Sequence, residues 1–332
     1  MPINQCTARE SASAAQGIRK LVIRKSGNQE NLTDPATPLP DCIDGEYCVE
    51  AFLARLRLYW PLTKSLQTGL LLSTGLAGYM SARCPVMHWY DFLGLGISLF
   101  MAIAGSMIIN MWYDRDIDAV MNRTHHRPLA DGRVTPAQAM HLGLTLSVLG
   151  VGLAVAMNPL YGLIVFAGLY FDVVVYTLWL KRRTTWSIVW GGIAGGMPVL
   201  AGRAYGMGSI DGVGILLTLA VLFWIPTHIL TFSMRYFDDY QATKIPTFPS
   251  TYGFPATRFT IALSSVIAAL AIATAGVLIG IQWGFVRVLA VMSAGLFLLA
   301  VASVFRPTER LNFGLFKYAS LYMLSAMILL SI

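Results

Sequence analysis

Long apolar segments are the feature that most constrains this chain. About nine windows of roughly twenty residues carry few or no charged side chains, and that is the length needed to cross a hydrocarbon core. Only 12% of the 332 residues are charged, whereas soluble domains carry about 25%. We therefore expect an all-α integral membrane bundle of about nine transmembrane helices. The windows lie near residues 62–80, 92–112, 139–157, 159–180, 186–202, 212–234, 259–281, 284–304 and 314–332.

The basic residues alternate between the two sides of this predicted bundle. Thirteen Lys and Arg fall in or next to the loops after the second, fourth, sixth and eighth windows, and only three fall in or next to the opposite loops. This asymmetry predicts an N-terminus on the cytoplasmic side or its organellar equivalent. It also explains the net charge of +7, so we expect a lipid bilayer, and no nucleic acid, as the partner of these side chains.

The polar parts of the chain suggest how it is divided. Residues 1–55 lack the apolar core of a signal peptide, and we expect a polar, mobile tail before a membrane domain over 56–332. The basic first 25 residues are compatible with a mitochondrial presequence, so both the endoplasmic reticulum and the mitochondrial inner membrane remain open. Two long polar loops, 113–138 and 235–256, lie four windows apart, which predicts two four-helix halves plus a final helix.

An acidic segment ends the second apolar window. Asn110, Asp114 and Asp118 recur at every fourth residue, and side chains at that spacing share one face of a helix. Three oxygen-bearing groups at the membrane rim are costly to desolvate unless a cation lies between them, and Mg²⁺ prefers carboxylates together with substrate phosphates. We therefore predict Mg²⁺ ligands here. The alternative is a solvated helix end with Asp116 facing water.

A second acidic pair, Asp238 and Asp239, follows the sixth window on the same predicted side, and we expect it to add metal ligands. Basic residues between the two clusters can bind phosphate oxygens. They include Arg123, Arg127, Lys181 and Arg182. Lys181 and Arg182 fit equally well as anchors that fix the topology. Metal-binding acids and phosphate-binding cations together predict a diphosphate site.

Three further side chains are predicted to contact the substrate. His228 lies in an apolar window, where an ionisable group is either functional or a satisfied core residue. Tyr176 and Tyr240 lie near basic and acidic segments, and aromatic faces can stabilise a carbocation, although both also suit an interface belt. The sequence has no GxxxxGK[ST], HExxH or GxSxG motif, which argues against ATPases and hydrolases.

Residues 110–134 (NMWYDRDIDAVMNRTHHRPLADGRV) resemble the first motif of the UbiA superfamily of intramembrane prenyltransferases, and the heme O synthase branch is most similar. The resemblance continues through residues 176–202 and 224–253 and covers roughly 60–332. It implies that the enzyme ionises an allylic diphosphate, releasing pyrophosphate and leaving a carbocation in an apolar tunnel. It also implies that Mg²⁺ is bound by Asn110, Asp114 and Asp118 with Asp239 in the second motif, and the phosphates by Arg123, Arg127 and Lys181.

The resemblance is uneven along the chain. Thr227 stands where the heme branch normally has proline before His228, and Met197–Pro198 replaces a usual pair of prolines. The segments that would bind the diphosphate match the family pattern, whereas other segments depart from it. We therefore expect a sesquiterpene cyclase acting on farnesyl diphosphate, as some fungal members of the superfamily are. Transfer of the farnesyl group to heme b or to an aromatic acceptor is the alternative. A lipid carrier or transporter is the non-enzymatic alternative.

Overall fold

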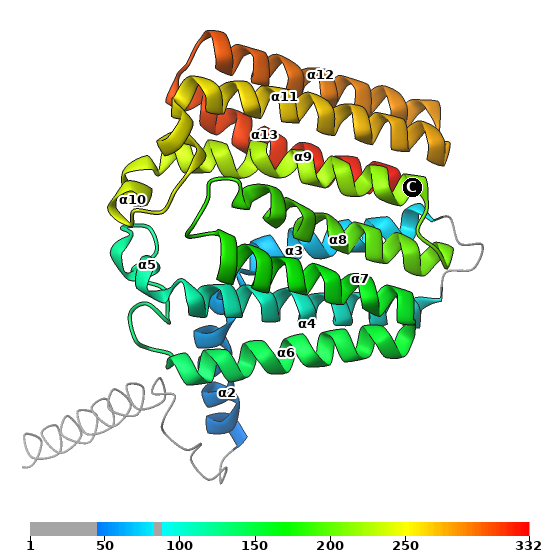
Figure 1. Cartoon of the computed structure of the whole chain (residues 1–332). Helices are drawn as coiled ribbons and strands as arrows, with labels where there is room; N and C mark the ends of the chain where they lie inside the picture. The colour runs from blue at the N-terminus through cyan, green and yellow to red at the C-terminus, as the bar shows by residue number, and fades with distance from the viewer. Residues whose placement is uncertain (1–44, 83–87, 332) are drawn as a thin grey trace, which may run out of the picture.

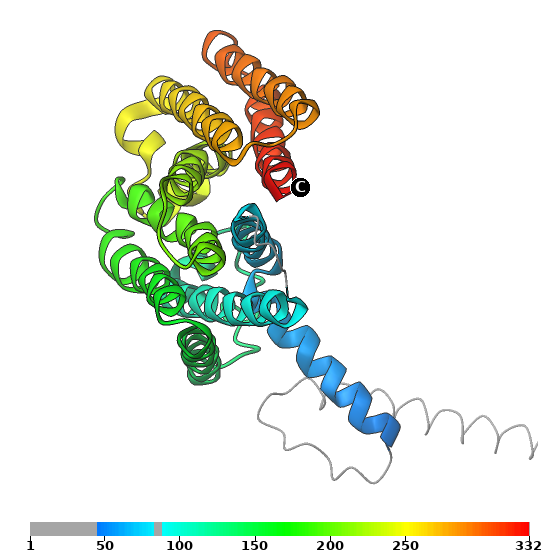
Figure 2. The ribbon, with the colours of Figure 1, turned by 90° about the vertical axis from the view of Figure 1, so that its right-hand side faces the viewer.

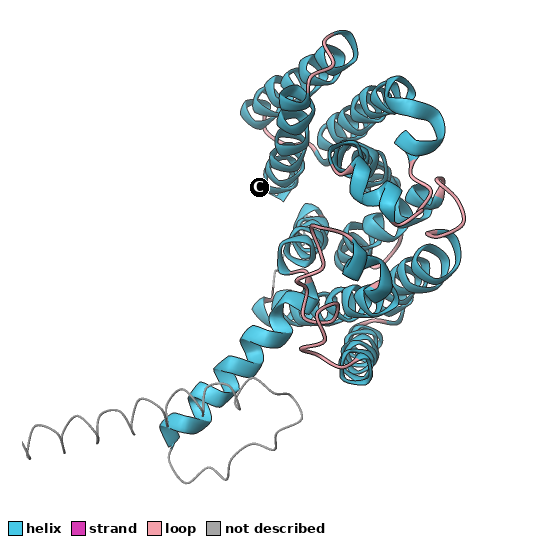
Figure 3. Cartoon of the chain, turned by 90° about the vertical axis from the view of Figure 1, so that its left-hand side faces the viewer, coloured by secondary structure: helices cyan, strands magenta, loops and turns pink. Residues whose placement is uncertain are grey.

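The computed structural model describes residues 45–82 and 88–331, and within these ranges the chain forms helices and loops without a strand (Figure 1, Figure 3). The short elements are α2 (Gly45–Tyr59), the 3₁₀ helix η1 (Trp60–Thr63), α5 (Arg115–Val120) and α10 (Phe237–Ala242). The long ones are α3 (Ser65–Ser81), α4 (Trp89–Tyr113), α6 (Pro136–Met157), α7 (Pro159–Tyr170) with the π-helical η2 (Phe171–Leu180), α8 (Ser187–Met207), α9 (Gly212–Arg235), α11 (Phe248–Ile279), α12 (Trp283–Phe305) and α13 (Glu309–Ser331).

The long helices of the described residues match the nine apolar windows one by one. Seven of them are long and apolar enough to cross a membrane: α4, α6, α7 continued by η2, α9, α11, α12 and α13. The other two are α3, which has only 17 residues, and the glycine-rich α8. The all-α prediction is therefore confirmed, and the count of nine spans is approximate.

Two expectations concern the ends of elements. The predicted mobile tail falls largely on residues 1–44, outside the described residues, but α2 is helical across the expected boundary at residue 55. The expected loop over 235–256 is mostly helical, because it holds α10 and the first turns of α11. Thr247 explains the early start of α11, since it forms a capping box with Ser250 and is followed by a proline in the first turn. A left-handed Gly253 (φ 79°) then kinks this helix.

The helices follow an arc, seen end-on in Figure 2. One core of buried apolar side chains lies among α3, α4, α6, α7 and α8, and a second lies mainly among α9, α11, α12 and α13. α8 contributes to both, through Val199 in the second core and Ala201 in the first. Where α8 crosses α3, a Cβ added at Gly202 would lie 2.9 Å from the carbonyl carbon of Gly75, so this crossing requires glycine.

α5 and α10 mark one end of the bundle. α5 follows α4 and α10 follows α9, and Figure 1 shows them near one another at the same end. A hydrogen bond of 3.2 Å from Asn122 Nδ2 to Asp239 Oδ1 joins the two segments, although these residues are 117 positions apart. The fold therefore brings the two acidic clusters to one place.

Candidate functional site

The first acidic cluster lies at the junction of α4 and α5. Asp114 separates the two helices, and backbone hydrogen bonds from its amide to Asn110 (3.0 Å) and from the Asp118 amide to its own carbonyl (2.8 Å) continue the helical spacing. Asn110, Asp114 and Asp118 are all buried. Asp116, by contrast, has a side chain that is 62% exposed. Of these four side chains, the junction between α4 and α5 therefore turns three inward and one outward.

Three polar contacts join α4 to η2 in a regular order, and we call them the α4–η2 ladder. Their members are the pairs Ser106–Asp172, Asn110–Thr177 and Asp114–Lys181. The α4 partners are four residues apart, whereas the partners on η2 are five and then four apart. A π-helical turn takes an extra residue, which keeps the two helices in register. The ladder runs from the end of the bundle into its apolar interior.

Two lysines lie inside the first cluster. Lys64 Nζ, at the N-cap of α3, donates to Asn110 Oδ1 at 2.7 Å, and Lys181 Nζ donates to Asp114 Oδ2. Burial and the neighbouring charges of Lys181 and Arg127 lower the pKa of Lys64 to about 8. Burial also disfavours the charged form of Lys181, but the Asp114 carboxylate outweighs it and raises the pKa of Lys181 above its ordinary value. Cations crowded in this way favour binding of a polyanion.

Two arginines complete the basic side of the site. Arg127 Nη1 binds Asp118 Oδ2 at 2.7 Å. The guanidinium of Arg123 lies over the rings of Phe232 and Tyr236, 4.8 and 5.3 Å from their centroids. These cation–π contacts hold Arg123 against α9 while leaving its hydrogen-bond donors unused by the rings.

Two buried polar atoms in this region have no hydrogen-bond partner among the described residues. They are the Nε of Arg123, a donor, and the Oδ1 of Asp114, an acceptor. A buried polar group without a partner is costly, so each such atom needs an explanation, such as a ligand that binds there. An orphaned donor and an orphaned acceptor together indicate a site for an anion and a cation.

The second acidic cluster contributes one carboxylate to this region. Asp239 accepts the hydrogen bond from Asn122 described above, and Asp238 is exposed on α10. Only Asp239 is therefore linked to the loop that carries Arg123. Asp238 and Asp239 differ in exposure because adjacent residues of the short helix α10 point in different directions.

The predicted metal ligands do not form a closed cage. Within the described ranges, no three Asp, Glu, His or Cys side chains are grouped so that they could hold one ion. Lys181 and Arg127 bind the Asp114 and Asp118 carboxylates. The oxygen chemistry still fits Mg²⁺, which usually takes one or two carboxylates and completes its shell with water and substrate phosphates. The set Asn110, Asp114, Asp118, Asp238 and Asp239 therefore stays a prediction, in which phosphate oxygens complete the metal's shell.

Arg182, Tyr176 and Tyr240 lie at the edge of the site. Arg182 makes a two-pronged pair with the exposed Asp116 at 2.7 and 2.8 Å, and this hydrogen bonding lowers the pKa of Asp116. Arg182 is thus engaged at the surface. The ring of Tyr176 lies 5.7 Å from Lys181 Nζ, and Tyr240 interacts electrostatically with both.

His228 lies deeper, between α9 and α13. Its ring stacks on Trp224 and Phe316, with centroids 5.0 and 4.5 Å away, and its Nδ1 is 3.2 Å from Ser320 Oγ. These contacts belong to the second core. Phe316 in turn contacts Phe232, the ring beneath Arg123, so His228 reaches the site through two aromatic side chains.

Sequence reasoning missed four polar residues of this region: Lys64, Asn122, Asp172 and Thr177. Lys64 and Asp172 had a signal, because each is the lone charged residue of its apolar window, and such residues are functional candidates. Thr177 and Asn122 had none. Their partners lie 67 and 117 positions away, and only the tertiary fold brings them together.

Solved structures share this architecture. A digeranylgeranylglyceryl phosphate synthase superposes with a TM-score of 0.69 at 17% identity, covering 83% of this chain and 97% of that one. A UbiA homolog from Aeropyrum pernix gives 0.65 at 19%, covering 79% and 96%. A UbiA homolog from Archaeoglobus fulgidus bound to GPP and Mg²⁺ gives 0.56 at 16%, covering 83% and 99%. At these identities the likeness establishes the fold.

Proteins found by sequence similarity have higher identities to this chain than these solved structures do. The protoheme IX farnesyltransferase of Archaeoglobus fulgidus is 36% identical over 274 residues, covering 81% of this chain and 95% of that protein. The protein of the same name from Korarchaeum cryptofilum is 41% identical over 219 residues, covering 66% and 74%. The profile of the UbiA prenyltransferase family matches residues 71–321. With that match over most of its length, the chain is an integral membrane enzyme that belongs to the UbiA prenyltransferase family.

Proposed function

We propose that this enzyme transfers the farnesyl group of farnesyl diphosphate to protoheme IX. We infer protoheme IX as the acceptor from the 36% identity to the Archaeoglobus protoheme IX farnesyltransferase, over 95% of that protein. This similarity favours transfer to heme over the sesquiterpene cyclase expected from the departures around Thr227. Membership in a prenyltransferase family also argues against a lipid carrier or transporter.

The diphosphate binds at the end of the α4–η2 ladder in this proposal. Four cations, Lys64, Arg123, Arg127 and Lys181, supply hydrogen bonds and charge to its oxygens. Metal ligands come from the first acidic cluster and from Asp239, and a UbiA homolog of the same fold holds GPP and Mg²⁺. Bound Mg²⁺ supplies electrostatic stabilisation of the leaving pyrophosphate.

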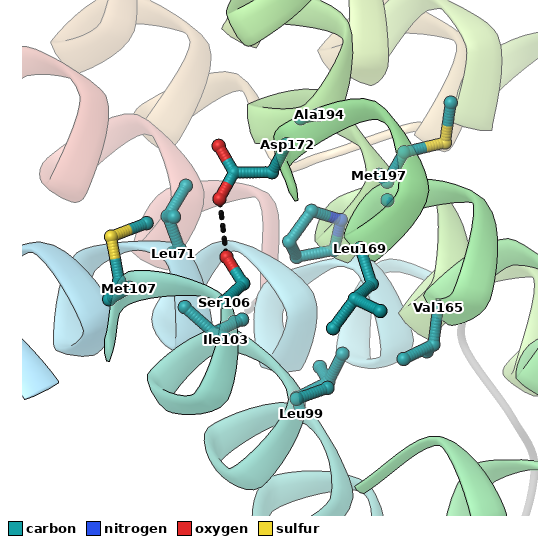
Figure 4. A pocket seen from close by; sticks show the side chains of 13 residues that line it. Leu71, Leu99, Ile103, Ser106, Met107, Val165, Leu169, Asp172, Ala194 and Met197 are labelled. Atoms are coloured by element: carbon teal, nitrogen blue, oxygen red, sulfur yellow. Dashed lines mark hydrogen bonds between the residues drawn. The ribbon is translucent and has the colours of Figure 1, made fainter. Parts of the chain in front are cut away.

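The first part of the prenyl chain extends from there into an apolar cavity of about 50 Å³ between α3, α4, α7 and α8 (Figure 4). Leu99, Ile103, Val165 and Met197 are among its lining residues. Loss of pyrophosphate leaves an allylic cation beside this lining. Apolar walls exclude bulk water, so the cation persists until it meets the acceptor.

The test uses membranes that contain the protein, with farnesyl diphosphate and Mg²⁺, in the presence or absence of protoheme IX. A farnesylated heme that forms only with added protoheme supports the proposal. A cyclic sesquiterpene formed without any acceptor would replace it by the cyclase. Asp114→Asn should abolish pyrophosphate release, and the exposed neighbour Asp116→Asn, which is matched in charge and position, should retain most of it.

A further inference from the structure

The innermost pair of the α4–η2 ladder is not among the side chains that we assign to the diphosphate. Ser106 Oγ donates a hydrogen bond to Asp172 Oδ2, and both residues line the apolar cavity (Figure 4). Asp172 is the sole charged residue in that lining as the described residues define it. An ionisable group inside a membrane bundle is costly to keep unless it has a function, and the hydrogen bond that Asp172 accepts comes from a neutral hydroxyl.

The ladder sets the distance of this carboxylate from the site of ionisation. Ser106 precedes Asn110 by one helical turn on the same face of α4, so it lies about 6 Å deeper along the axis. Asp172 also interacts electrostatically with Lys64, Lys181 and Asp114. The carboxylate therefore sits just beyond the diphosphate site, beside the first part of a prenyl chain that enters the cavity.

Chemistry that begins with loss of pyrophosphate must end with loss of a proton. The C–O bond of the allylic diphosphate breaks, and its electron pair leaves with pyrophosphate. A C=C bond of the acceptor then gives its electron pair to the allylic carbon, which forms a C–C bond and moves the positive charge to the acceptor. That charge is neutralised when a neighbouring C–H bond or an added water molecule gives up a proton. Both routes need a base inside the cavity.

We propose that Asp172 is this base, and this inference rests on the prenyl-transfer function proposed above. Its carboxylate takes the proton from the cation or from the water that adds to it. Transfer turns an ion pair in an apolar cavity into two neutral groups, which is strongly favoured where the dielectric constant is low. Pyrophosphate is the competing base, but the four cations at the end of the ladder hold its oxygens.

Asp172→Asn is the variant that tests this role, because asparagine can keep the hydrogen bond from Ser106 but cannot accept the proton. Two products are measured in parallel with farnesyl diphosphate, Mg²⁺ and protoheme IX: released pyrophosphate and farnesylated acceptor. In the variant, ionisation continues, but the cation is diverted to farnesol and simple alkenes, which lose their proton to pyrophosphate or to water at the mouth of the cavity. We expect the yield of prenylated acceptor per pyrophosphate to fall by at least about tenfold, since a positioned general base commonly contributes 10²-fold or more.

Two control variants separate catalysis from structure. Asp91→Asn alters a carboxylate near the other end of α4 that also accepts from a hydroxyl, that of Tyr205 at 2.6 Å, and it should leave the yield unchanged. Ser106→Ala keeps the Asp172 carboxylate but removes its hydrogen bond, so the yield should fall less than in Asp172→Asn. An unchanged yield in Asp172→Asn, or an equal loss of pyrophosphate release and product, would overturn the proposal. If the wild type makes a hydrocarbon instead, the heme assignment fails, and the yield per pyrophosphate still tests Asp172.

Discussion

The paired cations Lys181 and Arg182 offer a sharp test of the site, because they are adjacent in sequence but lie in different surroundings. Lys181 binds Asp114, whose side chain is 6% exposed, and Arg182 binds Asp116, whose side chain is 62% exposed. Removal of one partner of a buried pair leaves an uncompensated charge and costs about 3–5 kcal/mol, whereas an exposed pair contributes about 0–1 kcal/mol. We therefore compare Lys181→Met with Arg182→Met.

The expected loss for Lys181→Met is about 3 kcal/mol, the lower end of the range for buried pairs, because the Lys181 side chain is still 20% exposed. That corresponds to a rise of roughly 100-fold in the unfolded fraction. Arg182→Met should cost less than about 1 kcal/mol. In the double variant Asp114→Asn with Lys181→Met, the buried charge is gone, so most of the stability should return. Pyrophosphate release should not return, because the metal ligand is missing.

The measurement is thermal unfolding of the purified protein in detergent, together with pyrophosphate release from farnesyl diphosphate. With Asp114→Asn measured alone, the double variant completes a mutant cycle that isolates the Asp114–Lys181 coupling. Equal destabilisation by Lys181→Met and Arg182→Met would refute the description of Asp114–Lys181 as a buried ion pair. A double variant no more stable than Lys181→Met alone would do the same.

Three further outcomes are expected. Asn122→Ala removes the hydrogen bond to Asp239 and should raise the Mg²⁺ concentration needed for half-maximal pyrophosphate release, and an unchanged Mg²⁺ titration would count against that link. Gly202→Ala should destabilise the protein by about 1–3 kcal/mol by overpacking the α3–α8 crossing, and a midpoint equal to wild type would contradict the close approach. Hydrogen bonds from Arg203 lower the pKa of Asp211, so that stabilisation is present above the unfolded pKa of about 3.9 and is lost as pH falls through the lower folded value. Below about pH 4, wild type should therefore lose thermal stability more steeply than Asp211→Asn, and parallel pH profiles would exclude the effect.

Several features of the fold could be predicted before the structure, because the bilayer imposes simple rules. The apolar windows found the long helices, since a span needs about twenty residues with few charges. The fourfold spacing of Asn110, Asp114 and Asp118 placed them on one helical face, although a break between α4 and α5 lies within that run. Local signals such as the Thr247 capping box also exist in the sequence, but the polar composition around them favoured a loop.

Sequence by itself thus determined the membrane bundle, the long helical segments and the acid-rich and base-rich segments of the site, because these depend on composition and short-range periodicity. Only the tertiary structure decided which side chains meet. Lys64 contacts Asn110 across 46 positions of the chain, and Thr177 contacts Asn110 across 67. Asp239 contacts Asn122 across 117 positions. Tertiary packing also distinguished Lys181 from Arg182 and brought Asp172 into the apolar cavity. Such contacts depend on helix register and on the extra residue of a π-helical turn, and neither leaves a periodic signal in the chain.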